Sequence, residues 1–342
     1  MVKFILQTMK ERKNMIYPEF LKAGNTIGIC APSSGIGEDD FAEFEISLSH
    51  LKGQGWLIKE TGSVRSGLDE SAPPQVRGKE FNELTADNNV NAIICASGGD
   101  FLISMLPYVD AEAIRKNPKW IQGYSDPTSL LYYVTTVLDV ATIYGVNAGG
   151  FWMKKLHPSL IDGIEILKGN LPIQNSFDTY EGSRAGREDG YALNEKVNWI
   201  TPNGDVDING RLLGGCLDCI CDLIGTRYDG TLDFIKRYKD DGIIWYFDIF
   251  AMKAEAVHNT LFKMKDMGYF ENARGFVFGR VMFPSSFTGM SYIDAAKKIL
   301  GDAPMIFDAD VGHVPPKMTI INGAVASVKS SGGKGSLETF LK

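Results

Sequence analysis

The sequence predicts an α/β protein made of two domains, each with a sheet of its own. Three observations lead to this fold class. The chain has 342 residues, which is more than one ordinary hydrophobic core accommodates. Hydrophobic residues make up 44% of it and charged residues 23%, as in a folded globular protein. Short apolar segments alternate with segments of helical periodicity, which is the pattern of parallel strands joined by crossover helices.

The first domain is expected over residues 15–165, as a mostly parallel sheet of the Rossmann or flavodoxin type with helices on both faces. Segment 25–33, NTIGICAPS, is predicted to be a buried strand, and segment 39–55 a helix that ends at Gly53 and Gly55. Further strands are expected at 56–60, 90–99, 120–125 and 141–146, and further helices at 75–87, 111–118 and 127–138.

Residues 166–208 are polar and rich in turn residues, so they are expected to connect the first domain to a smaller α/β domain at 209–342. Segment 210–226, GRLLGGCLDCICDLIGT, is predicted to be a glycine turn followed by a helix. Strands are expected at 241–250 and 273–281 and helices at 254–268 and 291–300, and segments 304–313, 317–323 and 324–330 are predicted to complete a smaller sheet.

The composition excludes several classes of function. The net charge of −7 and a pI of about 5.3 argue against nucleic acid as a partner, because phosphate binding needs clustered basic residues. The chain has no apolar run of the roughly 18 residues that a membrane span requires. Five cysteines, an odd number, fit reduced thiols and a cytoplasmic location. Met15 is a second possible start, so residues 1–14 are expected to be an extension or an over-long start.

The segment WIQGYSDPT places Ser125 directly after an apolar strand and two residues before Pro127. At this position its hydroxyl group is expected at the carboxyl edge of the sheet, where open α/β folds bind ligands. The geometry resembles a nucleophile elbow, although Pro127 replaces the second glycine of G-x-S-x-G. The alternative is that Ser125 or Asp126 caps the following helix. Local sequence leaves both interpretations open.

A serine nucleophile needs a base and an orienting acid. Of the four histidines, His313 alone follows an apolar strand and a glycine, although a histidine in a loop is more often structural. Asp248 ends the apolar run IIWYF and can orient the imidazole, or it can serve as a structural cap or ion-pair partner. Gly98 and Gly99 can present N–H groups to an oxyanion together with the Asp126 amide, or form only a tight turn.

No cofactor or metal is expected. The turn APSSGIG does not match the dinucleotide-binding pattern G-x-G-x-x-G. Cys216, Cys219 and Cys221 have helical spacing without an accompanying histidine or fourth cysteine, so packing is favoured over metal binding.

Taken together, TIGICAPSSG, AIICASGGDFLISMLPYVD, IQGYSDPTSLL, GRLLGGCLDCICDLIGT, IIWYFD and DADVGH resemble the LD-carboxypeptidase family of serine peptidases, which includes the microcin C immunity peptidases. The resemblance extends from about Thr26 to Ser327. It implies that Ser125 is the nucleophile and His313 the base, and that the oxyanion amides belong to Gly98 or Gly99 and Asp126. It also implies a homodimer.

The sequence departs from this family at two positions. Asp248 stands where the family usually has glutamate. Because aspartate is one methylene shorter, a working triad requires the strand or His313 to shift by about that length. A slipped alignment would instead place Phe247 at this position and leave no acid. Cys216 replaces the asparagine of a Gly-Gly-Asn turn. The resemblance places substrate-binding residues at Ser97, Asp100 and Cys216.

The resemblance implies a serine carboxypeptidase that cleaves an L,D-peptide bond of a murein tetrapeptide and releases the terminal D-alanine. The alternative is hydrolysis of peptidyl- or aminoacyl-nucleotide amides, as in the immunity peptidases. Ser97 favours the alternative, because recycling enzymes commonly carry arginine at this turn. Trp152 and Trp199 are candidates for stacking on a base, and packing explains them equally well. A third hypothesis is a catalytically inactive two-domain binding protein.

Overall fold

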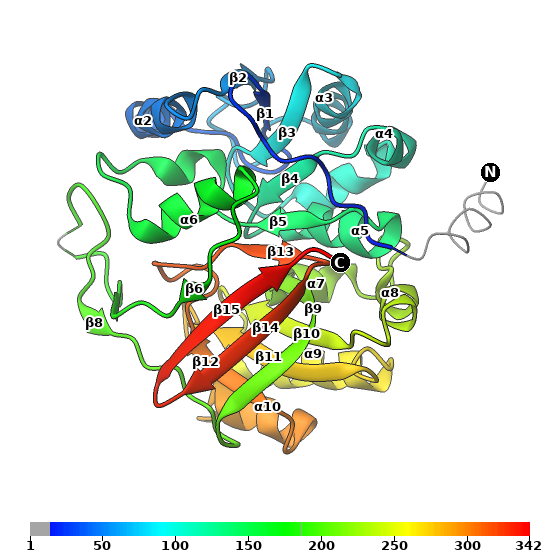
Figure 1. Ribbon diagram of the computed structural model, residues 1–342, viewed down its shortest axis with the longest axis vertical. Helices are drawn as coiled ribbons and strands as arrows, with labels where there is room; N and C mark the ends of the chain where they lie inside the picture. The colour runs from blue at the N-terminus through cyan, green and yellow to red at the C-terminus, as the bar shows by residue number, and fades with distance from the viewer. Residues whose placement is uncertain (1–13, 186) are drawn as a thin grey trace.

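The computed structural model describes residues 14–185 and 187–342, so the expected extension at 1–14 lies outside the described residues except for its last position. Within this part, two α/β units lie one above the other, each with a central sheet, as Figure 1 shows. The predicted α/β class is therefore confirmed. No described helix is both long and apolar enough to cross a membrane.

The first sheet has the order β13-β5-β4-β3-β1-β2, and its strands are parallel except for β13. In Figure 1, α2 and α6 cover one face and α3, α4 and α5 the other. The strands are β1 (Thr26–Cys30), β2 (Leu57–Glu60), β3 (Val90–Cys95), β4 (Trp120–Gly123), β5 (Thr142–Tyr144) and β13 (Ile320–Asn322). The helices are α2 (Phe41–Lys52), α3 (Pro74–Ala86), α4 (Ala111–Lys116), α5 (Thr128–Leu138) and α6 (Pro158–Leu167), with 3-10 turns η1 (Glu38–Asp40), η2 (Leu102–Tyr108) and η3 (Ala148–Phe151).

Helix α5 is buried over nearly its whole circumference. It lies between the two units and packs against α7, α8 and β9 of the second one. A helix buried on all sides needs apolar residues around its axis, and the sequence TSLLYYVTTVL provides them. The residues that precede α5, Ser125 among them, are therefore held at the domain boundary.

The second sheet has the order β12-β11-β10-β9-β14-β15-β6. Strands β9 to β12 are parallel, and β14, β15 and β6 add to them antiparallel. Its strands are β6 (Gln174–Asn175), β9 (Val206–Cys216), β10 (Ile243–Asp248), β11 (Ala273–Gly279), β12 (Met305–Ala309), β14 (Val325–Ser331) and β15 (Lys334–Phe340), and the helices of this unit are α7 (Leu217–Leu223), α8 (Thr231–Arg237), α9 (Ala254–Asp266) and α10 (Tyr292–Leu300). In the described residues this sheet has seven strands and the first has six, so the expectation of a smaller second sheet is wrong.

Strand β13 corrects a second expectation. The sequence predicts that segment 317–323 belongs to the C-terminal sheet, but Ile320 pairs antiparallel with Tyr144 of β5 in the first sheet. Ile320 and Ile321 are fully buried there, so the apolar pattern identified a strand correctly but not the sheet that it joins. The chain thus returns from the second unit to the first and back again, which connects the units twice more.

The glycine pair Gly214-Gly215 is not a turn, as was expected, but the last part of the long strand β9. A Cβ atom on Gly214 would lie 1.8 Å from the carbonyl oxygen of Tyr246 on the neighbouring strand β10. Glycine is therefore required here for the close approach of two backbones, a role that strand glycines often have. This approach sets Cys216 beside Asp248 in the register of β9 and β10.

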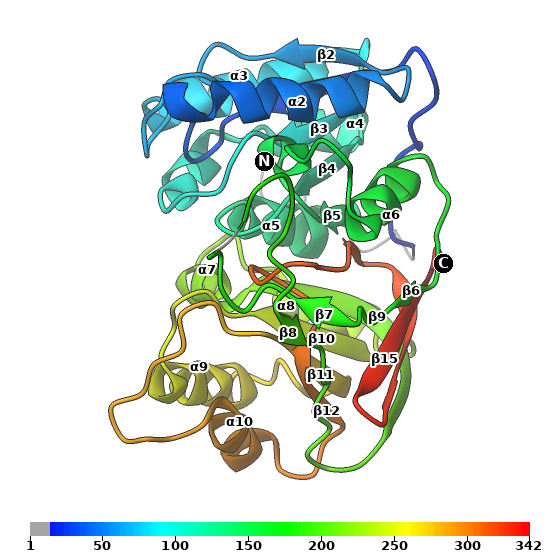
Figure 2. The same ribbon diagram turned by 90° about the vertical axis from the view of Figure 1, so that its left-hand side faces the viewer.

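The expected connection at 166–208 leads along one side of the molecule, as Figure 2 shows. Its first part continues α6, and β6 joins the edge of the second sheet by pairing with β15. Strands β7 (Thr179–Tyr180) and β8 (Glu195–Lys196) pair with each other as a separate small hairpin. The segment is therefore partly structured and borders both units.

We predict that Gly214→Ala lowers the free energy of unfolding by about 1–3 kcal/mol, because the added methyl group forces β9 and β10 apart. Urea unfolding followed by circular dichroism measures the change. Gly190→Ala is the control, because its added Cβ would meet no atom closer than 3.9 Å. Equal stability of the two variants would contradict the proposed close packing.

Candidate active site

Ser125 lies in the tight turn between β4 and α5, with a backbone φ of 68°. This left-handed conformation is uncommon for a residue other than glycine, and strained conformations of this kind concentrate at functional sites. The capping alternative fails, because no side chain caps α5, whose N-cap is Pro127 and whose first residue is Thr128. The Asp126 carboxylate accepts hydrogen bonds from the Ser33 hydroxyl group and the Leu102 N–H instead.

The hydroxyl of Ser125 lies 2.9 Å from Nε2 of His313, which is hydrogen-bond distance. His313 follows β12 after a short turn and reaches Ser125 from the second unit. Gly312 permits this approach, because its φ is 94° and a Cβ atom there would lie 2.1 Å from Oδ1 of Asp248. Of the other histidines, His50 contacts the Met153 carbonyl oxygen and His157 caps α6, while His258 is half-buried and contacts the Asn259 side chain.

Asp248 is the last residue of β10 and is completely buried. Its Oδ2 lies 2.7 Å from Nδ1 of His313 and accepts a hydrogen bond of 2.5 Å from the Tyr144 hydroxyl. Its Oδ1 accepts the backbone N–H of His313 at 3.2 Å. Burial by itself raises the pKa of Asp248, but His313, the Tyr144 hydroxyl and the charge of Lys317 lower it, and the net shift is downward. The carboxyl group is therefore held as the anion.

The shorter aspartate side chain thus reaches His313, because Gly312 lets the histidine backbone approach the carboxylate. The distance from Nδ1 to Oδ2 is that of direct contact, while the ring N–H is not aligned to form a regular hydrogen bond with this oxygen. Phe247, the residue that a slipped alignment would place here, is buried against the rings of Trp245 and Phe278. Asp248 is accordingly the acid that meets His313.

Two residues that the sequence did not single out complete the surroundings. Tyr144 ends β5, and burial together with the Asp248 carboxylate raises its pKa well above the usual range, so the phenol stays protonated as a donor. Asn147 accepts the Tyr124 N–H at 3.1 Å and so fixes the residue that precedes Ser125. Both residues lie at the carboxyl end of an apolar strand, which is the signal that would have identified them.

The three amides predicted for an oxyanion hole lie near Ser125 to different degrees. A Cβ atom on Gly98 would lie 3.1 Å from Cβ of Ser125, whereas one on Gly99 would meet the side chains of Ser33 and Ser34. Among the described residues, the N–H groups of Gly98, Gly99 and Asp126 donate no hydrogen bond to a backbone carbonyl oxygen. They are therefore available as donors, and Gly98 is the glycine in contact with Ser125.

A cavity of about 450 Å³ opens at Ser125 and His313 and lies between the two units. Ser97 lines it, whereas Asp100, which is exposed, and Cys216, which is 2% exposed, do not. Trp152 also lines it, while the other stacking candidate, Trp199, is buried and donates its indole N–H to Asp310 at 3.1 Å. The other lining residues are Ile36, Asp40, Glu43, Phe44, Ala96, Gly98, Tyr124, Asn147, Gly149, Gly150, Arg184 and Phe250.

The cysteines near the site are not reactive nucleophiles. Burial raises the pKa of the Cys95 thiol to about 12, and the Cys219 thiol together with burial raises that of Cys216. A thiol in such surroundings is not ionised near neutral pH and is chemically inert. In residues 14–185 and 187–342, no cluster of three histidine, cysteine or acidic side chains is arranged to hold a metal ion.

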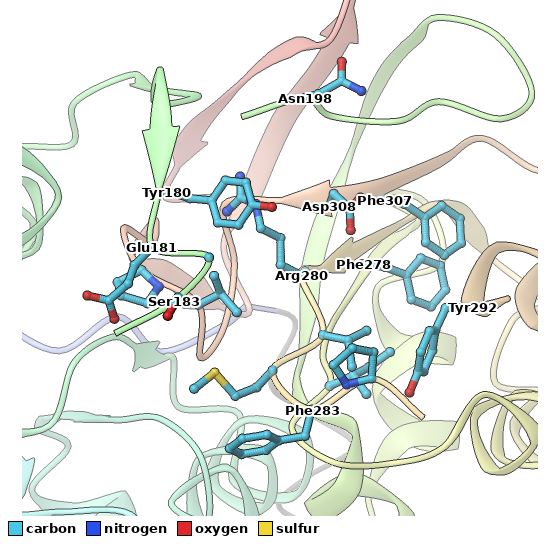
Figure 3. A pocket seen from close by; sticks show the side chains of 18 of the residues that line it. Tyr180, Glu181, Ser183, Asn198, Phe278, Arg280, Phe283, Tyr292, Phe307 and Asp308 are labelled. Carbon is cyan, nitrogen blue, oxygen red and sulfur yellow. The ribbon is translucent and has the colours of Figure 1, made fainter. Parts of the chain in front are cut away.

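A larger cavity of about 790 Å³ lies at the carboxyl ends of β10, β11 and β12 (Figure 3). Phe278, Phe307 and Tyr292 line it, and Arg184 borders both cavities. Its buried Arg280 pairs with Asp310 and lies over the ring of Tyr180. The described residues that line it include no histidine. The smaller cavity, which holds the hydrogen-bonded serine and histidine, is therefore the candidate active site.

Both units match models of known protein families. Residues 27–145 match the model of the LD-carboxypeptidase N-terminal domain, and residues 209–328 match that of the LD-carboxypeptidase C-terminal domain. Ser125 falls within the first match, and Asp248 and His313 fall within the second.

Several known proteins are similar over most of the chain. A Vibrio cholerae protein, provisionally named as a carboxypeptidase, is 27% identical over 89% of this chain and 92% of its own. The Escherichia coli microcin C7 self-immunity protein MccF is 24% identical over 90% of this chain and 91% of its own. The crystal structure of an MccF-like protein from Bacillus anthracis superposes with a TM-score of 0.79 at 22% identity, covering 96% of this chain and all of that one. Such structures share the fold.

We predict that Tyr144→Phe lowers the free energy of unfolding by about 1.5–3 kcal/mol near pH 7, the usual value of a hydrogen bond to a charged group. The pKa of Asp248 is lowered in the folded state, so the stability that its ionisation contributes is present above about pH 4 and is lost as the pH falls. The difference between wild type and variant should therefore shrink below that pH.

The control is Tyr246→Phe, whose hydroxyl donates to the neutral side chain of Asn322 at 2.9 Å. Its effect on unfolding should not depend on pH in this range. Urea unfolding at a series of pH values measures both variants. A Tyr144→Phe effect near pH 7 that is no larger than that of Tyr246→Phe, and equally independent of pH, would contradict an anionic acceptor at Asp248.

Proposed function

The chain belongs to the LD-carboxypeptidase family, and from this premise we propose that it is a serine-type hydrolase that cleaves an amide bond of a small peptide substrate through an acyl-enzyme. The observation that carries the proposal is the series of contacts from Ser125 to His313 to Asp248 across the domain boundary. A serine, a histidine and a buried carboxylate in this order form a catalytic triad. We propose the domain limits 15–165 and 209–342, with the connection at 166–208.

In this mechanism His313 accepts the proton of Ser125 through Nε2 as the hydroxyl oxygen attacks the amide carbonyl. The Asp248 anion stabilises the imidazolium that forms. The N–H groups of Asp126 and of Gly98 or Gly99 stabilise the oxyanion. His313 then donates its proton to the leaving amine, and water, activated by the same histidine, hydrolyses the acyl-enzyme.

The first candidate substrate is a murein tetrapeptide, from which the enzyme would release the terminal D-alanine by cleaving an L,D-bond. The family description supports it. So does the name of a Bacillus subtilis relative that is 24% identical over 66% of the chain, which describes a murein peptide carboxypeptidase. A cytoplasmic location and a homodimer agree with this role and stay predictions of the sequence.

The second candidate is an aminoacyl- or peptidyl-nucleotide amide. Trp152 in the wall of the catalytic cavity supports it, because an indole ring offers a stacking surface for a nucleobase. One face of this ring is occupied by the Arg187 guanidinium, 5.3 Å from the ring centroid. Structures of MccF with aspartyl sulfamoyl adenosine and glutamyl sulfamoyl guanosine are among the folds that match this chain. Ser97, in place of a carboxylate-binding arginine, agrees with it as well.

We predict that a fluorophosphonate probe labels the wild-type protein and that Ser125→Ala abolishes labelling. Asp248→Asn should slow labelling by about a thousandfold or more, because His313 loses the anion that orients it. Ser49→Ala, on the exposed part of α2, is the matched serine control and should label normally. A folded wild-type protein that does not label would instead support the inactive binding protein.

The substrate classes are separated by two assays with the same samples. Wild type is incubated with L-Ala-D-Glu-meso-diaminopimelate-D-Ala, and free D-alanine is measured; in parallel it is incubated with aspartyl sulfamoyl adenosine, and free aspartate is measured. We predict D-alanine release that Ser125→Ala lowers by about a thousandfold or more. Release of aspartate alone would assign the protein to the second class. Release of neither product from protein that labels at Ser125 would contradict both substrates.

A further inference from the structure

Lys317 is a buried lysine next to the catalytic residues, and the mechanism above does not use it. Its exposed fraction is 7%, and within the described residues it forms no ion pair with a carboxylate. Its ammonium nitrogen lies 3.2 Å from the centroid of the Tyr124 ring. Lysine is rarely buried unless its charge is compensated, and an aromatic face compensates it less than a carboxylate does. Such a placement points to a functional role.

Tyr124 connects this lysine to the base. It directly precedes Ser125, and its ring centroid lies 5.2 Å from that of His313. Its backbone is held by Asn147, and its ring meets that of Tyr144 edge to face at 6.3 Å. The Tyr124 ring is therefore packed between the Lys317 ammonium group and the His313 imidazole.

The charge of Lys317 also acts on the acid, since it is one of the groups that favour the Asp248 anion. A cation at this position opposes a second positive charge on His313, because like charges disfavour each other's ionised form. It therefore opposes the effect of Asp248, which favours the imidazolium. Removal of this cation is therefore expected to make the imidazole easier to protonate.

Other groups face His313 from each neighbouring element. Asp248 lies on β10, the phenols of Tyr144 and Tyr124 lie at the ends of β5 and β4, and the Cys216 thiol lies next to Asp248 at the end of β9. On the cavity side the charged side chains are Asp40, Glu43 and Arg184, all of them exposed. Exposed charges are screened by water and salt, so the buried Lys317 has the stronger influence on the ring.

We propose that Lys317 is a positioning residue: its side chain holds the Tyr124 ring against His313, and its charge opposes protonation of the imidazole. This inference rests on the proposed role of His313 as the base for Ser125. The segment after His313 would then have a second function, because the ammonium group four residues later influences how readily the base is protonated.

The test is the rate of fluorophosphonate labelling of Ser125 as a function of pH, which needs no knowledge of the natural substrate. Lys317→Met removes the charge and keeps a long apolar stem, and Lys317→Gln is a second neutral variant. Lys317→Arg keeps the charge. The control is Lys329→Met, because Lys329 is an exposed lysine on β14, with 59% of its side chain accessible, paired with Asp207.

Removal of the neighbouring cation should raise the pH at which His313 becomes protonated. The acidic limb of the labelling profile should therefore move upward by roughly 0.5 to 1 unit in both neutral variants. It should stay in place in Lys317→Arg and Lys329→Met. A labelling rate that falls equally at every pH, with the limb unmoved, would show a purely structural role and would overturn the proposal.

If wild type is not labelled, the proposed function fails, and the role of Lys317 is decided by nuclear magnetic resonance. The ring signals of His313 are assigned by their loss in His313→Asn and are titrated in wild type and in the neutral variants that fold. A higher midpoint in the variants supports the proposal. An unchanged midpoint overturns it.

Discussion

The site depends on one buried charge, the carboxylate of Asp248. An ion without solvent contact is costly unless it is paired and fully hydrogen-bonded, so its partners must come to it. They come from two distant parts of the chain: the Tyr144 hydroxyl from the first sheet, and the backbone and ring of His313 from the turn after β12. Satisfying this one anion therefore brings the two units together in the arrangement that places His313 on Ser125.

The two units are also joined by β13, which belongs by sequence to the second unit and by pairing to the first. Asn322 at its end accepts hydrogen bonds from the Gly214 N–H at 3.2 Å and from the Tyr246 hydroxyl. These contacts lie under the site and are completely buried. A change in domain orientation would break these contacts. The buried contacts therefore stabilise the same domain arrangement that places His313 beside Ser125. Regulation of activity by domain movement would have to overcome this cost.

Two aromatic rings flank His313, in addition to its polar partners Asp248 and Ser125. The rings of Tyr124 and Phe250 lie 5.2 Å and 4.6 Å from that of His313, and Lys317 lies beyond the first of them. These rings cover part of the imidazole, and the lower local polarity strengthens the influence of the charges near it. A buried anion and a buried cation of opposite effect thus act on the same ring.

The sequence by itself determined the α/β class, most of the strands and helices, and the positions of Ser125, Asp248 and His313 at the ends of apolar segments. These features are local, since each follows from the periodicity and turn residues of a short window. The tertiary structure alone decided that segment 317–323 joins the first sheet, that Gly214 lies within a strand, and that Tyr144, Asn147 and Lys317 surround the site. The reason is that these roles depend on partners far away in the chain, such as Tyr144 and Asp248, which are 104 residues apart. A local pattern shows that a residue will be buried, but only the folded chain determines what it is buried against.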